Sequence, residues 1–245
     1  MEPDNYEAKR QIGIVQQNVA VFDEFTVYEN IDYFCGLYIN DRKKRKQLVE
    51  EAIAFVGLED YRKIRPKKLS GGLLRRLNIA CGIAHKPRLI ILDEPTVAVD
   101  PQSRNRILEG IQQLNRQGST IIYTSHYMEE VEQICTRIAI MDHGRSIASG
   151  TKEQLTGMIK TGEKVTVEAV VLKEEQLVQI RELAHVFKVD YENDILRVQC
   201  TEAKHNLVRI LRYLEEQEIS FGRVYSEIPT LNDVFLEITG KELRD

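Results

Sequence analysis

Continuous apolar runs alternate with amphipathic stretches over roughly the first two thirds of the chain. The apolar runs are residues 11–15, 89–92 and 119–126, and each predicts a strand. The run 89–92 has no polar interruption, which is typical of a strand buried on both faces of a parallel sheet. Because a helical pattern over 102–117 joins the last two runs, they predict a βαβ unit with a right-handed crossover.

Short polar motifs mark the helix starts in the same part of the chain. Thr26 and Glu29 form a Thr-x-x-Glu capping box, which predicts a helix to about residue 38. The other elements expected here are helices over 43–56, 73–84 and 127–134, two short strands on either side of residues 143–144, and a helix start at Thr151.

After residue 160 the pattern changes to short alternating segments. Val165, Val167 and Ala169 alternate with polar residues, as in a half-exposed strand. The segments that follow predict a helix with the stripe Leu177, Ile180 and Ala184, a hairpin turning at 191–194, a helix with the stripe Leu207, Ile210, Leu211 and Leu214, and a strand over 219–225. This β-α-β-β-α-β order matches the ferredoxin-like split motif.

The pattern therefore divides the chain into three predicted regions. Residues 1–155 form an α/β domain, and residues 160–226 form a small α+β ferredoxin-like domain. Residues 227–245 form a closing amphipathic helix, whose apolar stripe is Leu231, Val234, Phe235 and Ile238.

Composition excludes some classes of function. With 42% hydrophobic and 29% charged residues, a folded chain is expected. The net charge of −4 gives no general electrostatic reason to bind nucleic acid. No apolar run approaches the length of a membrane span, so we expect any membrane role to come through a partner. The four cysteines lack metal-site spacing, and they are interpreted as reduced thiols of a cytoplasmic protein.

Two acids and a histidine follow the neighbouring strands of the predicted βαβ unit. Ligands of open α/β sheets bind outside the carboxyl ends of the strands. We expect Asp93 to hold Mg²⁺ there and Glu94 to orient or deprotonate an attacking water. His126 ends the next strand, so it should lie near Glu94 and can hydrogen-bond a γ-phosphate. The alternatives are acids that cap the next turn and an ordinary histidine at a helix start.

Ser70, Gly71 and Gly72 precede a helical stretch. Two glycines at this place expose backbone N–H groups at the positive end of the helix dipole, an arrangement that binds phosphate. The alternative is a plain turn in which Ser70 caps the helix.

The order and spacing of these motifs resemble the ATP-binding-cassette (ABC) transporter ATPases. Gln17 is similar to the Q-loop glutamine, "LSGGLLRR" to the ABC signature, and "LIILDEPT" to the Walker B strand. "VAVDP", with Asp100, is similar to the D-loop, and "TSHYMEE" to the switch-histidine segment. The wording "DEPTVAVDP" and the tail "TLNDVFLEITGKELRD" resemble cassettes of the ABC-2, drug-resistance-like exporters, which also carry a small C-terminal domain.

The resemblance implies a P-loop NTPase-type parallel sheet and a mechanism. Two cassettes, which are either identical or different, dimerise head to tail around two ATP molecules. Ser70, Gly71 and Gly72 therefore act on the nucleotide of the partner cassette. Asp93 and Gln17 hold Mg²⁺, and Glu94 and His126 are the catalytic pair. Membrane permease subunits dock between Val19 and Phe25, which holds the cassette at the cytoplasmic face of the membrane.

The sequence departs from the family pattern in one large respect, since no G-x-x-x-x-G-K-[ST] phosphate loop occurs in it. The nearest string, "GMIKTGEKV" at 157–165, has an extra residue before its lysine and precedes a strand rather than a helix. In this family the loop lies upstream of the Q-loop, where only sixteen residues precede Gln17. The expectation is a cassette without its N-terminal strands, with exposed sheet edges and negligible ATPase activity by itself.

Smaller departures are Leu73, where many signatures have Gln, and Ala98, where Gly is commoner.

Three hypotheses about the function of the chain stay open. The chain is an exporter ATPase that lacks its start, or a non-catalytic half that donates the signature in trans to a complete cassette. The third is a regulatory binding module centred on residues 160–226. The retention of Glu94 and His126 favours the first, because both serve the nucleotide of their own subunit.

Overall fold

The computed structural model describes residues 5–169 and 171–240. The chain divides into two compact units, Met1–Cys135 and Thr136–Asp245. The three-part division predicted at 155, 160 and 227 stays a prediction. The last residues of the predicted closing segment, 241–245, lie outside the described residues.

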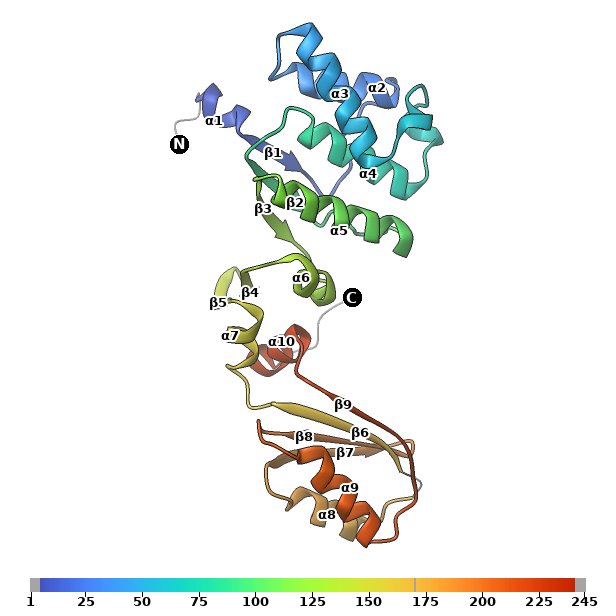
Figure 1. Ribbon diagram of the computed structural model, residues 1–245, viewed down its shortest axis with the longest axis vertical. Helices are drawn as coiled ribbons and strands as arrows, with labels where there is room; N and C mark the ends of the chain where they lie inside the picture. Colours follow the sequence, from blue (N-terminus) through green and yellow to red (C-terminus); the bar gives the residue numbers. More distant parts are fainter. Residues whose placement is uncertain (1–4, 170, 241–245) are drawn as a thin grey trace. The chain divides into compact units, whose positions relative to one another are not determined.

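The first unit combines a parallel sheet with helices (Figure 1). Its elements are α1 (Tyr6–Arg10), β1 (Ile12–Val15), α2 (Val27–Gly36), α3 (Arg42–Val56), the 3₁₀ turns Glu59–Tyr61 and Pro66–Lys68, α4 (Gly71–Ile83), β2 (Leu89–Asp93), α5 (Pro101–Arg116), β3 (Thr120–Thr124) and α6 (Met128–Ile134).

The sheet has the order β1-β2-β3, and both pairs of strands are parallel. Val15 pairs with Leu92, and Leu92 pairs with Tyr123, so the carboxyl ends of all three strands meet at one edge. The predicted βαβ unit is confirmed, because β2, α5 and β3 follow one another in the chain and the two strands are neighbours.

Capping residues fix where the helices of this unit begin. Thr26 and Glu29 form the predicted capping box of α2. Helix α4 begins at Gly71 rather than at the predicted residue 73, because the Ser70 hydroxyl accepts the N–H of Leu73 and makes Ser70 the N-cap. The two signature glycines are therefore the first two residues of the helix.

Helix α4 lies against β1 with almost no side chain between them. A methyl group at Gly82 would lie 2.7 Å from Cγ2 of Val15 and 2.9 Å from the carbonyl oxygen of Ile14. A methyl group at Gly13 would lie 2.4 Å from the carbonyl oxygen of Gly82. Glycine at both positions lets the two backbones approach, and α4 thereby buries one face of the sheet.

The other face of the sheet is only partly covered by the described residues. Ile90 and Leu92 of β2 are buried, but Leu89 and Ile91 are only half-buried. On the same side as Ile91, Ile14 is 57% exposed and Ile122 is 48% exposed. The prediction that residues 89–92 are buried on both faces was wrong, because the described helices of this unit pack on one face.

The second unit begins with a two-stranded hairpin and continues as a four-stranded antiparallel sheet with helices (Figure 1). Its elements are β4 (Ile138–Asp142), β5 (Arg145–Gly150), α7 (Lys152–Thr156), β6 (Glu163–Ala169), α8 (Glu174–Arg181), β7 (Val186–Glu192), β8 (Ile195–Cys200), α9 (Asn206–Glu216), β9 (Phe221–Glu227) and α10 (Leu231–Thr239).

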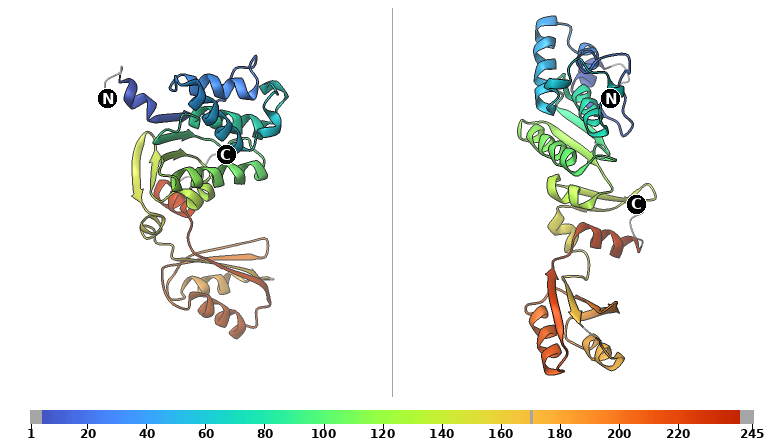
Figure 2. Two further views of the ribbon diagram at one scale, coloured as in Figure 1. Left: turned by 45° about the horizontal axis from the view of Figure 1, so that its top comes forward. Right: turned by 90° about the vertical axis from the view of Figure 1, so that its right-hand side faces the viewer.

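The strand order β7-β8-β6-β9, with antiparallel neighbours, is that of the predicted ferredoxin-like split motif. Helices α8 and α9 cover one face of this sheet (Figure 2), and Ile180 and Leu214 are fully buried in its core. The predicted hairpin turn narrows to Asn193 and Asp194, which both have positive φ angles.

Helix α10 is tied to the start of β6 by polar contacts. Lys164 lies 3.0 Å from both carboxylate oxygens of Asp233. Glu237 accepts hydrogen bonds from the backbone N–H of Lys160 and from the hydroxyl of Thr161. The closing helix is therefore a docked part of the second unit and not a free tail.

Candidate functional site

The two acids at the end of β2 are hydrogen-bonded to the end of β3. Asp93 is the last residue of β2, and its Oδ1 accepts the hydroxyl of Thr124 at 2.6 Å. The backbone N–H of Glu94 donates to the Thr124 carbonyl at 3.2 Å and to its hydroxyl at 3.1 Å. Glu94 has a φ of 47°, so the chain turns sharply at this residue. Thr124 thus joins the ends of the two strands.

His126 contacts the second acid. Its Nδ1 lies 3.1 Å from Oε1 and 3.0 Å from Oε2 of Glu94. A carboxylate in its ionised form only accepts hydrogen bonds, so Nδ1 would be the donor in this contact when Glu94 is ionised. The structure therefore brings Asp93, Glu94 and His126 together at one sheet edge, on adjacent strands, as the sequence predicted. Their catalytic roles stay predictions.

Gln17 lies two residues beyond β1 at the same sheet edge, and helix α4 holds its backbone. Nη1 of Arg75 donates to the carbonyl oxygens of Gln16 at 3.2 Å and Gln17 at 2.7 Å. Asn78 adds a bond from its amide to the Gln16 carbonyl and accepts the N–H of Ala20. Arg75 is 7% exposed, and burial lowers its pKa.

Sequence reasoning missed the Arg75 and Asn78 contacts. Their partners lie about sixty positions earlier in the chain, at Gln16 and Gln17. The available signal was the spacing of three residues, which puts Arg75 and Asn78 on one face of a helix. That spacing alone does not say what the face contacts.

The signature turn packs against the segment that begins α5. Asp100 caps α5 by accepting the N–H of Ser103 at 2.9 Å, and this hydrogen bond lowers the pKa of Asp100. A methyl group at Gly72 would lie 2.5 Å from the Ser103 hydroxyl and 3.0 Å from Oδ2 of Asp100. Only glycine fits there without displacing the cap, so the structure brings the predicted signature and D-loop residues side by side.

An aromatic cluster covers the segment between Val19 and Phe25. The ring of Phe22 lies 5.0 Å from that of Tyr33, 5.2 Å from that of Phe25 and 5.9 Å from that of Phe34. Phe22 is 40% exposed and Tyr33 is 44% exposed. Exposed aromatic groups of this kind are typical of protein interfaces.

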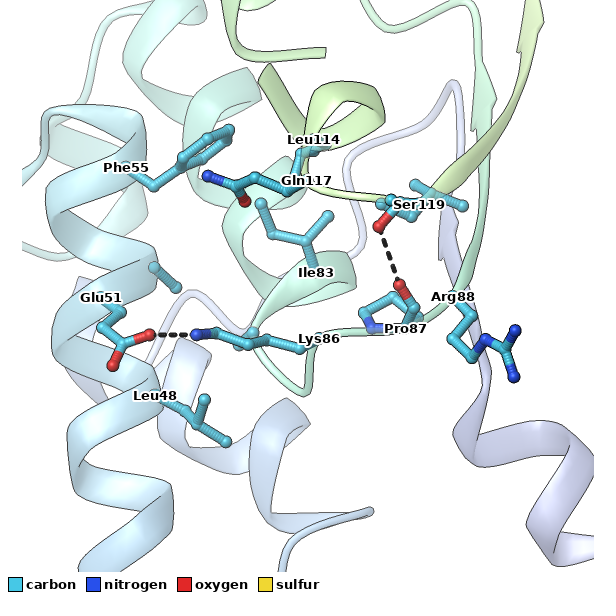
Figure 3. Close-up of a pocket in the computed structure, with 14 residues that line it drawn as sticks. Leu48, Glu51, Phe55, Ile83, Lys86, Pro87, Arg88, Leu114, Gln117 and Ser119 are labelled. Atoms are coloured by element: carbon cyan, nitrogen blue, oxygen red, sulfur yellow. Dashed lines mark hydrogen bonds and ion pairs between the residues drawn. The ribbon is translucent and has the colours of Figure 1, made fainter. Parts of the chain in front are cut away.

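A separate pocket of about 460 Å³ lies at the opposite, amino ends of β2 and β3 (Figure 3). Phe55 and Leu48 of α3 line one side, and Leu114 and Gln117 line another. Lys86 forms an ion pair with Glu51 across it. The predicted site residues do not line this pocket.

The predicted Mg²⁺ ligands fit that ion by their chemistry. Asp93 offers a carboxylate oxygen and Gln17 an amide oxygen, and Mg²⁺ is commonly bound by one or two such groups together with phosphates. Among residues 5–169 and 171–240, no cluster of three or more His, Cys, Asp or Glu side chains forms a metal site. Within the same ranges, no helix has both the length and the apolar character needed to cross a membrane.

Two segments of the chain match known protein families. Residues 2–97 match the family described as "ABC transporter". Residues 153–239 match the family described as "ATP-binding protein DrrA1-3-like, C-terminal domain".

Curated relatives match along nearly the whole chain. The linearmycin resistance ATP-binding protein LnrL of Bacillus subtilis (strain 168) is 40% identical over 97% of this chain and 77% of its own length. The Nod factor export ATP-binding protein I of Rhizobium sp. (strain N33) is 32% identical over 96% of this chain and 75% of its own length. The daunorubicin resistance ATP-binding protein DrrA3 of Streptomyces coeruleorubidus is 31% identical over 98% of this chain and 75% of its own length.

Two solved structures share the fold. The structure of an ATP-binding subunit of an ABC transporter gives a TM-score of 0.57 at 22% identity, over 63% of this chain and 65% of that one. The structure of cbiO1 from Clostridium perfringens, part of the ABC transporter complex cbiONQ, gives 0.53 at 27% identity, over 58% of each chain. The chain thus spans less than two thirds of either structure. With the relatives above, these matches confirm that the chain belongs to the ATP-binding proteins of the ABC transporter family, among relatives named for drug resistance and Nod factor export.

Proposed function

We propose that this chain powers an ABC exporter, with Asp93, Glu94 and His126 acting on ATP at the carboxyl edge of the β1-β2-β3 sheet. The observation that carries the proposal is the contact of Glu94 with His126 across adjacent strand ends. A carboxylate and an imidazole that face each other there can orient a water and bind a terminal phosphate oxygen together.

Each group has a distinct task in the proposal. Asp93 would hold Mg²⁺ with the help of Gln17, and the ion would neutralise charge on the phosphates. Glu94 accepts a proton from the attacking water, or orients that water. His126 keeps the Glu94 carboxylate in place through Nδ1. Its other ring nitrogen, Nε2, donates to a phosphate oxygen only when the ring is doubly protonated, because Nε2 of the neutral Nδ1–H form is an acceptor. Oε2 of Glu94 is buried and lacks a directed hydrogen bond, so it has capacity for a water.

A second cassette completes the site in the proposal. Gly71 and Gly72 begin α4, so their backbone N–H groups belong to the helix end that favours anions. They act on the partner's ATP, and Asp100 beside them lies at the dimer interface. The partner can be a second copy or a related cassette.

Permease subunits are the proposed membrane partners, and they hold the cassette at the inner face of the membrane. The aromatic cluster around Phe22 supports docking between Val19 and Phe25, because it offers exposed apolar rings beside the Gln17 segment. Arg75 and Asn78 tie this segment to α4. Docking there would therefore reach the signature helix directly.

Hydrolysis also needs a glycine-rich phosphate loop, which the 245 residues do not contain. The test compares ATP hydrolysis and ATP-dependent dimerisation for these residues and for a form extended by the upstream coding sequence. We expect turnover only in the extended form, and a loss of about 10²-fold or more when Glu94→Gln is introduced there. The matched control is Glu129→Gln, an exposed glutamate close to the same edge.

The alternative is a half-cassette that donates Ser70, Gly71 and Gly72 in trans. It predicts that the unextended chain stimulates a complete partner cassette, and that Glu94→Gln in this chain leaves the stimulation unchanged. Equal turnover by the extended and unextended forms would contradict both versions.

A further inference from the structure

A single buried carboxylate, that of Glu130, connects the segments on either side of the acid–histidine pair. Glu130 belongs to α6 and is 3% exposed. Its Oε2 accepts the hydroxyls of Thr96 at 2.8 Å, Tyr123 at 2.5 Å and Ser125 at 3.2 Å. These three residues come from the loop after β2 and from the end of β3, which are the segments that carry Glu94 and His126.

The other oxygen of Glu130 faces a cation on a third element. Oε1 lies 3.3 Å from Nε of Arg104, as an ion pair without the direction of a hydrogen bond. Arg104 is in the first turn of α5, where its N–H donates to the carbonyl of Asp100. One carboxylate thus reaches the loop after Glu94, the strand before His126 and the helix that follows the predicted D-loop.

Both chain neighbours of His126 are held by this network. The Ser125 hydroxyl donates to Glu130 and accepts the backbone N–H of Tyr127 at 3.0 Å. The guanidinium of Arg104 lies 4.8 Å from the centre of the Tyr127 ring, and that ring lies 4.1 Å from the His126 imidazole. The imidazole is therefore flanked by two anchored residues, while its own contact is with Glu94.

We propose that Glu130 is a positioning residue, which keeps the His126 imidazole turned toward Glu94 and links it to the first turn of α5. The proposal rests on the proposed function of the Glu94–His126 pair. A buried carboxylate is costly unless it is paired and hydrogen-bonded. Three hydroxyls and one guanidinium meet that requirement only when the loop after β2, the end of β3 and α5 keep these positions relative to one another. Glu130 therefore selects the arrangement in which His126 meets Glu94.

The test reads the His126 ring in the chain as it is, without nucleotide. Long-range ¹H–¹⁵N spectra of neutral histidines distinguish the Nδ1–H from the Nε2–H form. His126 is assigned by its loss in His126→Gln. We expect the Nδ1–H form in the unmodified chain. Glu130→Gln should shift the ratio of the two forms by about fivefold toward Nε2–H. This is the change expected when the hydrogen bond from Nδ1 of His126 to Glu94 is weakened.

Glu129→Gln is the matched control, because Glu129 precedes Glu130 in the same helix and is exposed. It should leave the His126 signals unchanged. In a Glu94→Gln background, Glu130→Gln should have little further effect, since the partner of Nδ1 has already been changed.

The urea midpoint of each variant is measured in parallel. A purely structural role predicts a lower midpoint for Glu130→Gln with the His126 ratio unchanged, and that result would overturn the proposal. If Glu130→Gln does not fold, Thr96→Val decides, because it removes one hydroxyl from Glu130 and does not contact His126. An unchanged ratio in that variant would overturn the proposal too. Because no nucleotide is involved, failure here is separate from failure of the ATPase proposal, which turnover of Glu94→Gln tests.

Discussion

The close contact between α4 and β1 decides whether an alanine at position 82 stabilises or destabilises the first unit. Gly82→Ala adds one methyl group in the last turn of α4, where helix propensity alone favours alanine over glycine by at most about 1 kcal/mol. At Gly82 that methyl would lie 2.7 Å from Cγ2 of Val15 and 2.9 Å from the carbonyl oxygen of Ile14. The second neighbour is backbone in the parallel sheet, so it cannot move away cheaply.

Overpacking of this kind costs about 1–3 kcal/mol, and the rigid neighbour favours the upper end of that range. After the helix-propensity gain is subtracted, we expect Gly82→Ala to lower the free energy of unfolding by about 1–2 kcal/mol. With a urea m value of about 1–3 kcal/mol per molar, the midpoint of the first unit should fall by roughly 0.3–2 M.

Gly110→Ala is the matched control. Gly110 is in α5, and a methyl group there would lie 3.4 Å from the Phe55 ring, which is ordinary contact. The same substitution should therefore raise the free energy of unfolding by about 0.5–1 kcal/mol. Urea unfolding followed by circular dichroism measures both changes. A Gly82→Ala chain as stable as the unmodified one, or more stable, would refute the close-approach argument.

Three other predictions concern the candidate site and the second unit. Gly72→Ala should displace the Asp100 cap of α5 and lower the free energy of unfolding of the first unit by about 1 kcal/mol, the usual contribution of a cap, as measured by urea unfolding. Phe22→Ala should weaken binding to the permease with little change in ATP hydrolysis by the extended form, as measured by co-purification and turnover. Burial acts to raise the pKa of Asp233, but hydrogen bonds from Thr230 and the charge of Lys164 lower it overall. The stability that Asp233 contributes should therefore be fully present above its unfolded pKa of about 4 and be lost as the pH falls through its lower folded pKa. Hydrogen exchange in α10 should show this dependence of stability on pH. Asp233→Asn should remove the dependence.

Local signals predicted the elements of this fold well. The capping box at Thr26 and the helix start at Thr151 are confirmed, because in both cases the capping partner lies only three residues further along the chain. The strand order of the second unit followed from the succession of elements, since the split motif connects them in one way. The adjacency of Glu94 and His126 followed from the βαβ unit, which makes consecutive parallel strands neighbours.

Contacts between distant segments were not predictable in the same way. Burial of 89–92 on both faces was inferred from its composition, but a strand's composition does not show which elements cover it. Glu130 reads as one of several acids in a polar helix start, and its burial depends on hydroxyls that lie up to 34 residues away. Arg75 reads as part of a basic pair after the signature, and only the folded chain shows that it holds the Gln17 backbone.

Helix α4 connects two of the predicted motifs by itself, and this bears on how ATP binding reaches a membrane partner. Ser70 caps its first turn, and Arg75 holds the Gln17 carbonyl from the second turn. A helix segment this short is rigid, because each of its residues is fixed by backbone hydrogen bonds. The Gln17 segment therefore cannot shift relative to the signature glycines without breaking the Arg75 and Asn78 bonds. In the proposed function, a partner that pushes on the aromatic cluster beside Gln17 would move the signature with it, so permease docking and closure around the nucleotide would both act through α4.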